Sequence, residues 1–127
     1  MRNLDVVFYR REWIRRDWQY EFPAVALEAF LAEQQRELEQ FDVCLRSLEE
    51  DLTQPIQGYA DLLNSIRLRF PSAGLGNLCL GHVIGASPNR NLLEDLRRGI
   101  NRLVFAPETI EPQGSDKRVC HNCGCGC

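Results

Sequence analysis

The sequence predicts a mainly α-helical protein: a small bundle of about three helices, one of them long and heptad-like, followed by a cysteine-rich tail. Two observations lead to this fold class. Apolar residues recur at spacings of three and four over much of the first 106 residues, and prolines and glycines divide that stretch into helix-sized segments. The chain has 127 residues, of which 44% are hydrophobic and 26% charged, values typical of one globular domain.

Residues 1–22 are predicted to form a basic and aromatic N-terminal arm. The run at residues 5–9 is β-branched and aromatic, which is typical of a short strand or an extended segment. Arginines and tryptophans are interleaved in the rest of the arm: Arg10, Arg11, Trp13, Arg15, Arg16 and Trp18. Such a set could contact phosphates and stack on bases. Alternatively, the tryptophans cap a helical core and the arginines pair with acids of a neighbouring helix.

A long helix is predicted over residues 23–52, where apolar side chains form a heptad-like stripe. One polar residue, Gln34, interrupts the stripe. The apolar members are Leu27, Leu31, Leu38, Phe41, Leu45, Leu48 and Leu52. The stripe either packs inside a monomeric bundle or pairs with a second copy in a dimeric coiled coil.

A second helix is predicted from Ile56 to about Phe70, because Pro55 cannot continue the long helix. Residues 75–85 are apolar but interrupted by glycine. This pattern favours a compact, partly buried loop or a small hairpin.

A third helix is predicted after Ser87 and Pro88, which suit the cap and the first turn of a helix. Pro107 ends it, so the helical domain is expected to span residues 1–106. Residues 107–118 are polar and contain proline and glycine, which predicts a flexible linker. Residues 119–127 form the tail.

Charge is unevenly distributed, although the formal net charge is only −3. The first 20 residues carry five arginines and three acids, whereas residues 23–52 carry eight acids and two arginines. This distribution excludes a uniformly basic nucleic-acid binder but leaves room for a local basic patch.

Four of the six cysteines lie in the last eight residues, at Cys-x-x-Cys and Cys-x-Cys spacing. Thiolates at these spacings can chelate a soft ion such as zinc or copper(I), and the intervening glycines let the backbone fold around it. The tail therefore predicts a metal site. Its cysteines are Cys120, Cys123, Cys125 and Cys127.

A second chelating pair, Cys79 and His82, lies in the glycine-bearing segment. Two such pairs separated by a structural element are how closed zinc sites are built. The sequence thus predicts that Cys79 and His82 join Cys120 and Cys123 in a Cys3His site that fastens the tail to the body. Alternatively, Cys79 and His82 only pack in an apolar loop. The four tail thiols would then bind an ion alone, or share it between two chains.

No catalytic set of residues can be recognised, so the sequence predicts no enzyme. A Ser–His–Asp set, a phosphate-binding glycine loop and a dinucleotide fingerprint are not found. A redox role for the Cys-x-x-Cys pair would need a βαβ context, which the predicted helices do not provide.

These features favour a small regulatory protein that binds zinc, or alternatively copper(I), and acts through a protein partner. The alternatives are a nucleic-acid-binding regulator that uses the basic arm, a protein that handles copper or zinc, and a precursor whose tail is modified. No apolar run is long enough for a membrane span, and the N-terminus does not resemble a signal peptide. An intracellular, reducing location such as the cytoplasm is therefore expected.

Overall fold

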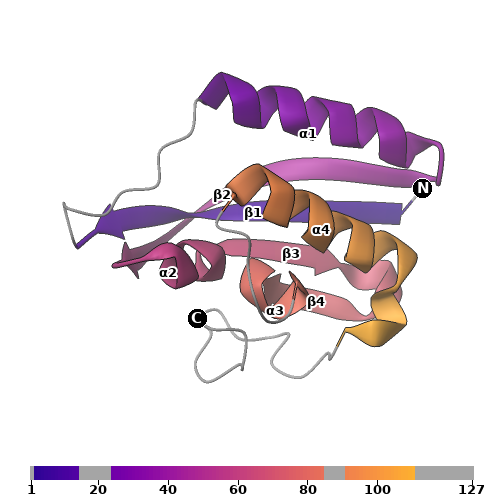
Figure 1. Cartoon of the computed structure of the whole chain (residues 1–127). Coiled ribbons are helices and arrows are strands. Elements are labelled where there is room, and N and C mark those ends of the chain that lie inside the picture. Colours follow the sequence, from indigo (N-terminus) through magenta and orange to yellow (C-terminus); the bar gives the residue numbers. More distant parts are fainter. Residues whose placement is uncertain (1, 15–23, 85–90, 111–127) are drawn as a thin grey trace.

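The computed structural model describes residues 2–14, 24–84 and 91–110, and these residues form a mixed α/β fold. The strands β1 (Arg2–Trp13), β2 (Val43–Ile56), β3 (Ile66–Phe70) and β4 (Leu75–Cys79) form a sheet in the order β2-β1-β3-β4. The other elements are α1 (Ala24–Glu39), α2 (Tyr59–Asn64), α3 (Leu80–Ile84), α4 (Leu92–Phe105) and the 3-10 turns η1 (Pro71–Ala73) and η2 (Pro107–Thr109) (Figure 1). The prediction of a mainly helical bundle is therefore wrong.

The N-terminal segment is a strand in the interior of the sheet, not an arm. β1 pairs with β2 in parallel and with β3 in antiparallel orientation, while β3 turns through η1 into an antiparallel β4. Because α1 lies between the parallel strands in sequence, β1, α1 and β2 form a βαβ unit. The strand expected at residues 5–9 is confirmed, and it extends to Trp13.

A continuous apolar core lies between the sheet and the described helices, all of which contribute to it. Successive strand residues point to opposite faces, so alternate residues of each strand enter this core. Those from the strands include Leu4, Val6, Phe8, Val43, Leu45, Ile66, Leu68 and Phe70. In Figure 1, α1 and α4 run along the strands, and α4 contacts both α1 and α3. The alternate strand residues form the opposite face of the sheet.

The long helix predicted over residues 23–52 is in fact a helix followed by a strand. α1 ends at Glu39, Asp42 adopts a left-handed backbone (φ 62°), and β2 begins at the next residue. The apolar spacing of the helix continues past this turn by coincidence. Leu38 is a buried residue of α1 and Leu45 is a buried residue of β2, whereas Phe41 and Leu48 are exposed. A coiled coil built on this stripe is wrong, because the stripe does not lie on one face.

The second predicted helix is also divided. α2 covers six of its residues, the last five form β3, and Ile56 is the end of β2. In β3 the apolar Ile66, Leu68 and Phe70 alternate with Arg67 and Arg69, which is the period-two pattern of a strand. The glycine-bearing segment that follows forms β4, the second strand of a hairpin, and then α3.

The third predicted helix is confirmed as α4. Its N-cap is Asn91, whose side-chain Oδ1 accepts the backbone N–H of Glu94 at 3.1 Å. The cap predicted at Ser87 lies outside the described residues. The chain leaves the helix at Ala106, just before Pro107, as the sequence indicates. None of the helices in the described ranges is long and apolar enough to cross a membrane.

Candidate functional site

A cavity of about 430 Å³ opens between β1 and β2, where the two strands change register. Tyr9 pairs with Glu50, and Arg11 pairs with Gln54, so three residues of β2 stand opposite one residue of β1. Extra residues make a strand bulge away from its partner, and bulges are frequent beside functional sites. The described residues that line the cavity are Phe8, Tyr9, Arg10, Arg11, Glu49, Glu50 and Asp51.

Opposite charges meet at this cavity, with arginines on β1 and carboxylates on β2. Arg10 Nη1 lies 3.8 Å from Asp51 Oδ1. Arg10 Nε and Nη2 also donate to Thr53 Oγ1 at 3.4 and 3.3 Å. The Arg10 and Asp51 side chains are 68% and 94% exposed, so water screens their attraction and the ion pair contributes little to stability.

Arg11 holds its charge in a less solvated position than Arg10. Burial lowers the pKa of the Arg11 guanidinium, and the neighbouring Glu49 carboxylate acts in the opposite direction. A guanidinium stays protonated in proteins, so the lowered pKa indicates poor solvation of the cation and not a neutral side chain. The cavity therefore has a half-buried cation on its β1 side.

A polar network on the face opposite the helices leads to the same cavity. Arg69 Nη1 lies 2.8 Å from Glu50 Oε1, and this hydrogen bond raises the pKa of Arg69. Arg69 Nε donates to Asn77 Oδ1 at 3.0 Å, and Asn77 Nδ2 donates to Tyr9 Oη at 3.4 Å. The guanidinium carbon of Arg67 lies 5.3 Å from the centre of the Tyr9 ring. The network crosses β2, β3, β4 and β1, and it positions Tyr9 and Glu50 at the cavity.

A second ion pair on this face ties β1 to β2. Arg46 Nε and Nη2 donate to Asp5 Oδ1 and Oδ2 at 2.8 and 3.0 Å. This bidentate hydrogen bonding raises the pKa of Arg46. Asp5 and Arg46 are also partners in the parallel register, so the pair supports that register three residues before the cavity.

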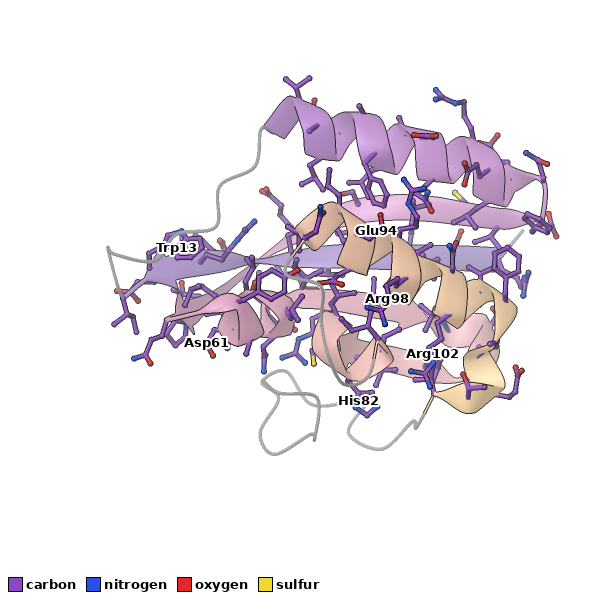
Figure 2. The ribbon with its side chains drawn as sticks, in the orientation of Figure 1. Trp13, Asp61, His82, Glu94, Arg98 and Arg102 are labelled. Carbon is purple, nitrogen blue, oxygen red and sulfur yellow. The ribbon has the colours of Figure 1, made fainter. Side chains whose placement is uncertain are left out.

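Cys79 and His82 lie next to each other at the junction of β4 and α3. Cys79 is buried at the end of β4, and its Sγ accepts the backbone N–H of His82 at 3.3 Å. Cys79 thus takes the N-cap position of α3 and His82 the N3 position, a pair whose side chains lie close together. His82 is half-buried and lies on the outer side of α3 in Figure 2.

These two residues do not make a metal centre with other described residues. Within residues 2–14, 24–84 and 91–110, no group of three or more His, Cys, Asp or Glu side chains is arranged to hold a metal ion. The site expected from Cys79, His82, Cys120 and Cys123 takes two of its ligands from outside these ranges, so it stays a prediction. The tail residues Cys120, Cys123, Cys125 and Cys127 lie outside the described residues, so their binding of zinc or copper(I) stays a prediction.

Of the basic and aromatic residues predicted to bind nucleic acid, three lie in β1 and the other three lie outside the described residues. Arg10, Arg11 and Trp13 belong to β1, where Trp13 is half-buried and pairs with Ile56 (Figure 2). Arg15, Arg16 and Trp18 lie outside the described residues. The two described arginines face carboxylates of β2, so they do not form an isolated basic patch.

An exposed aromatic pair lies where the α1–β2 turn meets the end of α4. The rings of Phe41 and Phe105 are 4.9 Å apart, edge to face at 87°, and the residues are 50% and 52% exposed. An Arg2 nitrogen, Nη2, donates to the Phe41 carbonyl at 3.2 Å, and the Arg2 guanidinium lies 5.4 Å from the Phe70 ring. Phe41 was predicted as a dimer contact, whereas the sequence analysis did not single out Phe105.

The sequence analysis also missed the cavity. Glu49 and Glu50 fall within the long helix predicted over residues 23–52, so their position beside Arg10 and Arg11 was not anticipated. The signal that could have revealed β2 is the alternation of Val43 and Leu45 with polar neighbours, although it spans few residues.

Comparison with known proteins adds no relative. No family model, curated protein or solved structure matches this chain.

Proposed function

We propose that this chain is a small α/β interaction protein of regulatory type that binds a protein partner through the exposed end of its helical layer. The observation that carries the proposal is the contact between Phe41 and Phe105. Two half-exposed aromatic rings in contact form an apolar surface that water solvates poorly. Aromatic residues, together with arginine, are also the residue types enriched at the energetic centres of protein interfaces.

The charge of α4 indicates what kind of partner would fit. Its acids, Glu94 and Asp95, lie in the first turn, and its arginines lie further towards Phe105. Arg97 and Arg98 are exposed, and Arg98 lies on the outer side of α4 between Glu94 and Arg102 in Figure 2. Basic charge therefore increases towards the aromatic pair. A complementary partner is an acidic segment that carries an apolar anchor for the phenylalanines.

The pairing of β1 with β2 weakens the case for nucleic-acid binding. Arg10 and Arg11 lie beside the carboxylates of Glu49, Glu50 and Asp51, which would repel a phosphate backbone. The proposed partner is accordingly a protein and not a nucleic acid. The proposed activity is binding without a catalytic step.

Selection of peptides from a random displayed library on the full chain would test the proposal. Selected peptides should be enriched in Asp and Glu around an apolar residue. The double variant Phe41→Ser/Phe105→Ser should lose their binding, because it removes the apolar surface. Val25→Ser is the matched control, since Val25 is 76% exposed on α1 and lies outside the aromatic pair.

Fluorescence anisotropy with one selected peptide would then separate the apolar from the charged contribution. Arg97→Glu/Arg98→Glu should weaken binding by about tenfold or more and should reduce its dependence on salt. Binding that survives loss of both phenylalanines, or a selection without acidic enrichment, would contradict the proposal. Circular dichroism would check that each variant is folded.

A further inference from the structure

The cavity between β1 and β2 is separate from the partner surface. It lies beside Tyr9, seven residues along β1 from Arg2, which is roughly 20 Å at the rise of a strand. Its volume of about 430 Å³ falls in the range of sites for small molecules, about 300–1,000 Å³. A ligand for it would therefore be a small molecule, independent of the proposed protein partner.

The lining of the cavity carries both signs of charge. Arg10 and Arg11 come from β1, and Glu49, Glu50 and Asp51 come from β2. A purely anionic ligand would lie beside the carboxylates, and a purely cationic ligand would lie beside the guanidiniums. Since unfavourable charges exclude wrong partners, the lining favours a ligand that bears both charges.

Some of these charged side chains make only long or solvent-exposed interactions with other described residues. Arg10 makes its described contacts at 3.3 Å or longer, with Thr53 and Asp51. Glu49 is exposed, and its described interaction is the electrostatic attraction of the Arg11 guanidinium. Arg10 can therefore turn towards a ligand carboxylate, and Glu49 and Asp51 towards a ligand ammonium, without breaking a strong interaction.

Three other residues that line the cavity are held in place by burial or by an ion pair. Phe8 and Tyr9 are buried, at 8% and 2% exposure, and Glu50 is held by Arg69 at 2.8 Å. Because Phe8 and Tyr9 are neighbours in a strand, their side chains point to opposite faces of the sheet, and each contributes only a small part of the cavity lining. The site thus combines fixed residues of β1 and β2 with adjustable charged side chains around them.

We infer that this cavity is a binding site for a free α-amino acid. Arg10 receives the carboxylate of the ligand, for which a guanidinium is suited by its paired donors. Glu49 and Asp51 receive the ammonium. No bond is formed or broken, so the inferred activity is binding.

A titration of the full-length, isotope-labelled protein by NMR would test this inference. Each common amino acid would be added up to about 10 mM, a range that includes weak binding. Binding of at least one amino acid should shift amide signals of residues 8–11 and 49–51. For leucine, the matched probes are isoamylamine, which lacks the carboxylate, and N-acetylleucine, which lacks the ammonium; an equivalent pair would be used for any other amino acid that binds.

Both single-charge probes should bind about tenfold more weakly than the amino acid, because each loses charged hydrogen bonds. Arg10→Gln and Glu49→Gln/Asp51→Asn should weaken binding by a similar factor. Arg36→Gln, at an exposed arginine of α1, is the control and should change nothing. The same spectra report whether each variant is folded. The inference is overturned if no amino acid shifts these signals, if the single-charge probes bind as well, or if the cavity variants bind like the control.

Discussion

Removal of the Tyr59 hydroxyl should destabilise the fold strongly, because this hydroxyl donates to a buried carboxylate. Tyr59 Oη lies 2.5 Å from Asp95 Oδ2 and joins α2 to α4. Asp95 is 0% exposed, and Arg98 Nη1 lies 3.6 Å from its other oxygen. In the Tyr59→Phe variant this oxygen loses a short, charge-assisted hydrogen bond in a place that water does not reach.

The size of the effect follows from the charge of the acceptor. A hydrogen bond to a charged group contributes about 1.5–3 kcal/mol, and removing the donor leaves the acceptor desolvated. Asp95 keeps its contact with Arg98, so we expect Tyr59→Phe to lower the free energy of unfolding by about 2 kcal/mol. The comparison variant is Tyr9→Phe, which removes a longer 3.4 Å bond from the Asn77 amide and an interaction with the Arg69 guanidinium, which Glu50 still holds; it should cost about 1 kcal/mol, less than Tyr59→Phe.

Urea denaturation of the wild type and both variants would measure these differences, provided that the dependence on urea is the same in each. A double-mutant cycle with Asp95→Asn would isolate the energy of the Tyr59–Asp95 pair from other effects of each substitution. Equal losses for Tyr59→Phe and Tyr9→Phe, or no coupling between Tyr59 and Asp95, would refute the reasoning.

Three further predictions concern the core and the tail. Gln34 is 1% exposed and its Oε1 has no hydrogen-bond partner among the described residues, so Gln34→Leu should raise the melting temperature, whereas Gln35→Leu at an exposed site should not. A Cβ at Gly99 would lie 2.6 Å from Cδ1 of Leu80, a fully buried side chain with little room to move, so Gly99→Ala should lower the free energy of unfolding in urea by about 1 kcal/mol or more despite its gain in helix propensity; an unchanged value would show that the Leu80 side chain shifts at little cost. Native mass spectrometry of the reduced protein tests the metal prediction: one zinc per chain, lost after removal of the tail or in Cys79→Ser, is expected, and no bound metal would contradict it.

Local patterns predicted the elements whose determinants lie close together in sequence. α4 has its N-cap, its apolar face and its terminating proline within about one helix length, and each of these acts over a few residues. The strand at residues 5–9 was predicted because a run of β-branched and aromatic residues favours extended backbone. Both elements were found without knowledge of what they pack against.

Local sequence patterns led to wrong predictions where the apolar residues of one segment fit both the helical and the strand periodicity. Leu38, Phe41, Leu45 and Leu48 are spaced as on a helix, yet the chain turns at Asp42 and continues as a strand. In β3, Ile66 and Phe70 are four residues apart and so share a face in a helix as well as in a strand. Pairing with β1 decides between the two, because β2 and β3 complete their backbone hydrogen bonds on that strand.

The sequence by itself determined the supply of chemical groups: a basic N-terminal segment, an acidic segment after it, and a cluster of tail thiols. It also determined α4 and the extended character of β1. The tertiary structure decided which of these groups meet. Parallel pairing places Arg10 and Arg11 beside acids some 40 residues away, and the register change between Tyr9 and Arg11 opens the cavity between them. Such contacts depend on strand order and register, which arise from packing over the whole domain and not from the residues of either segment alone.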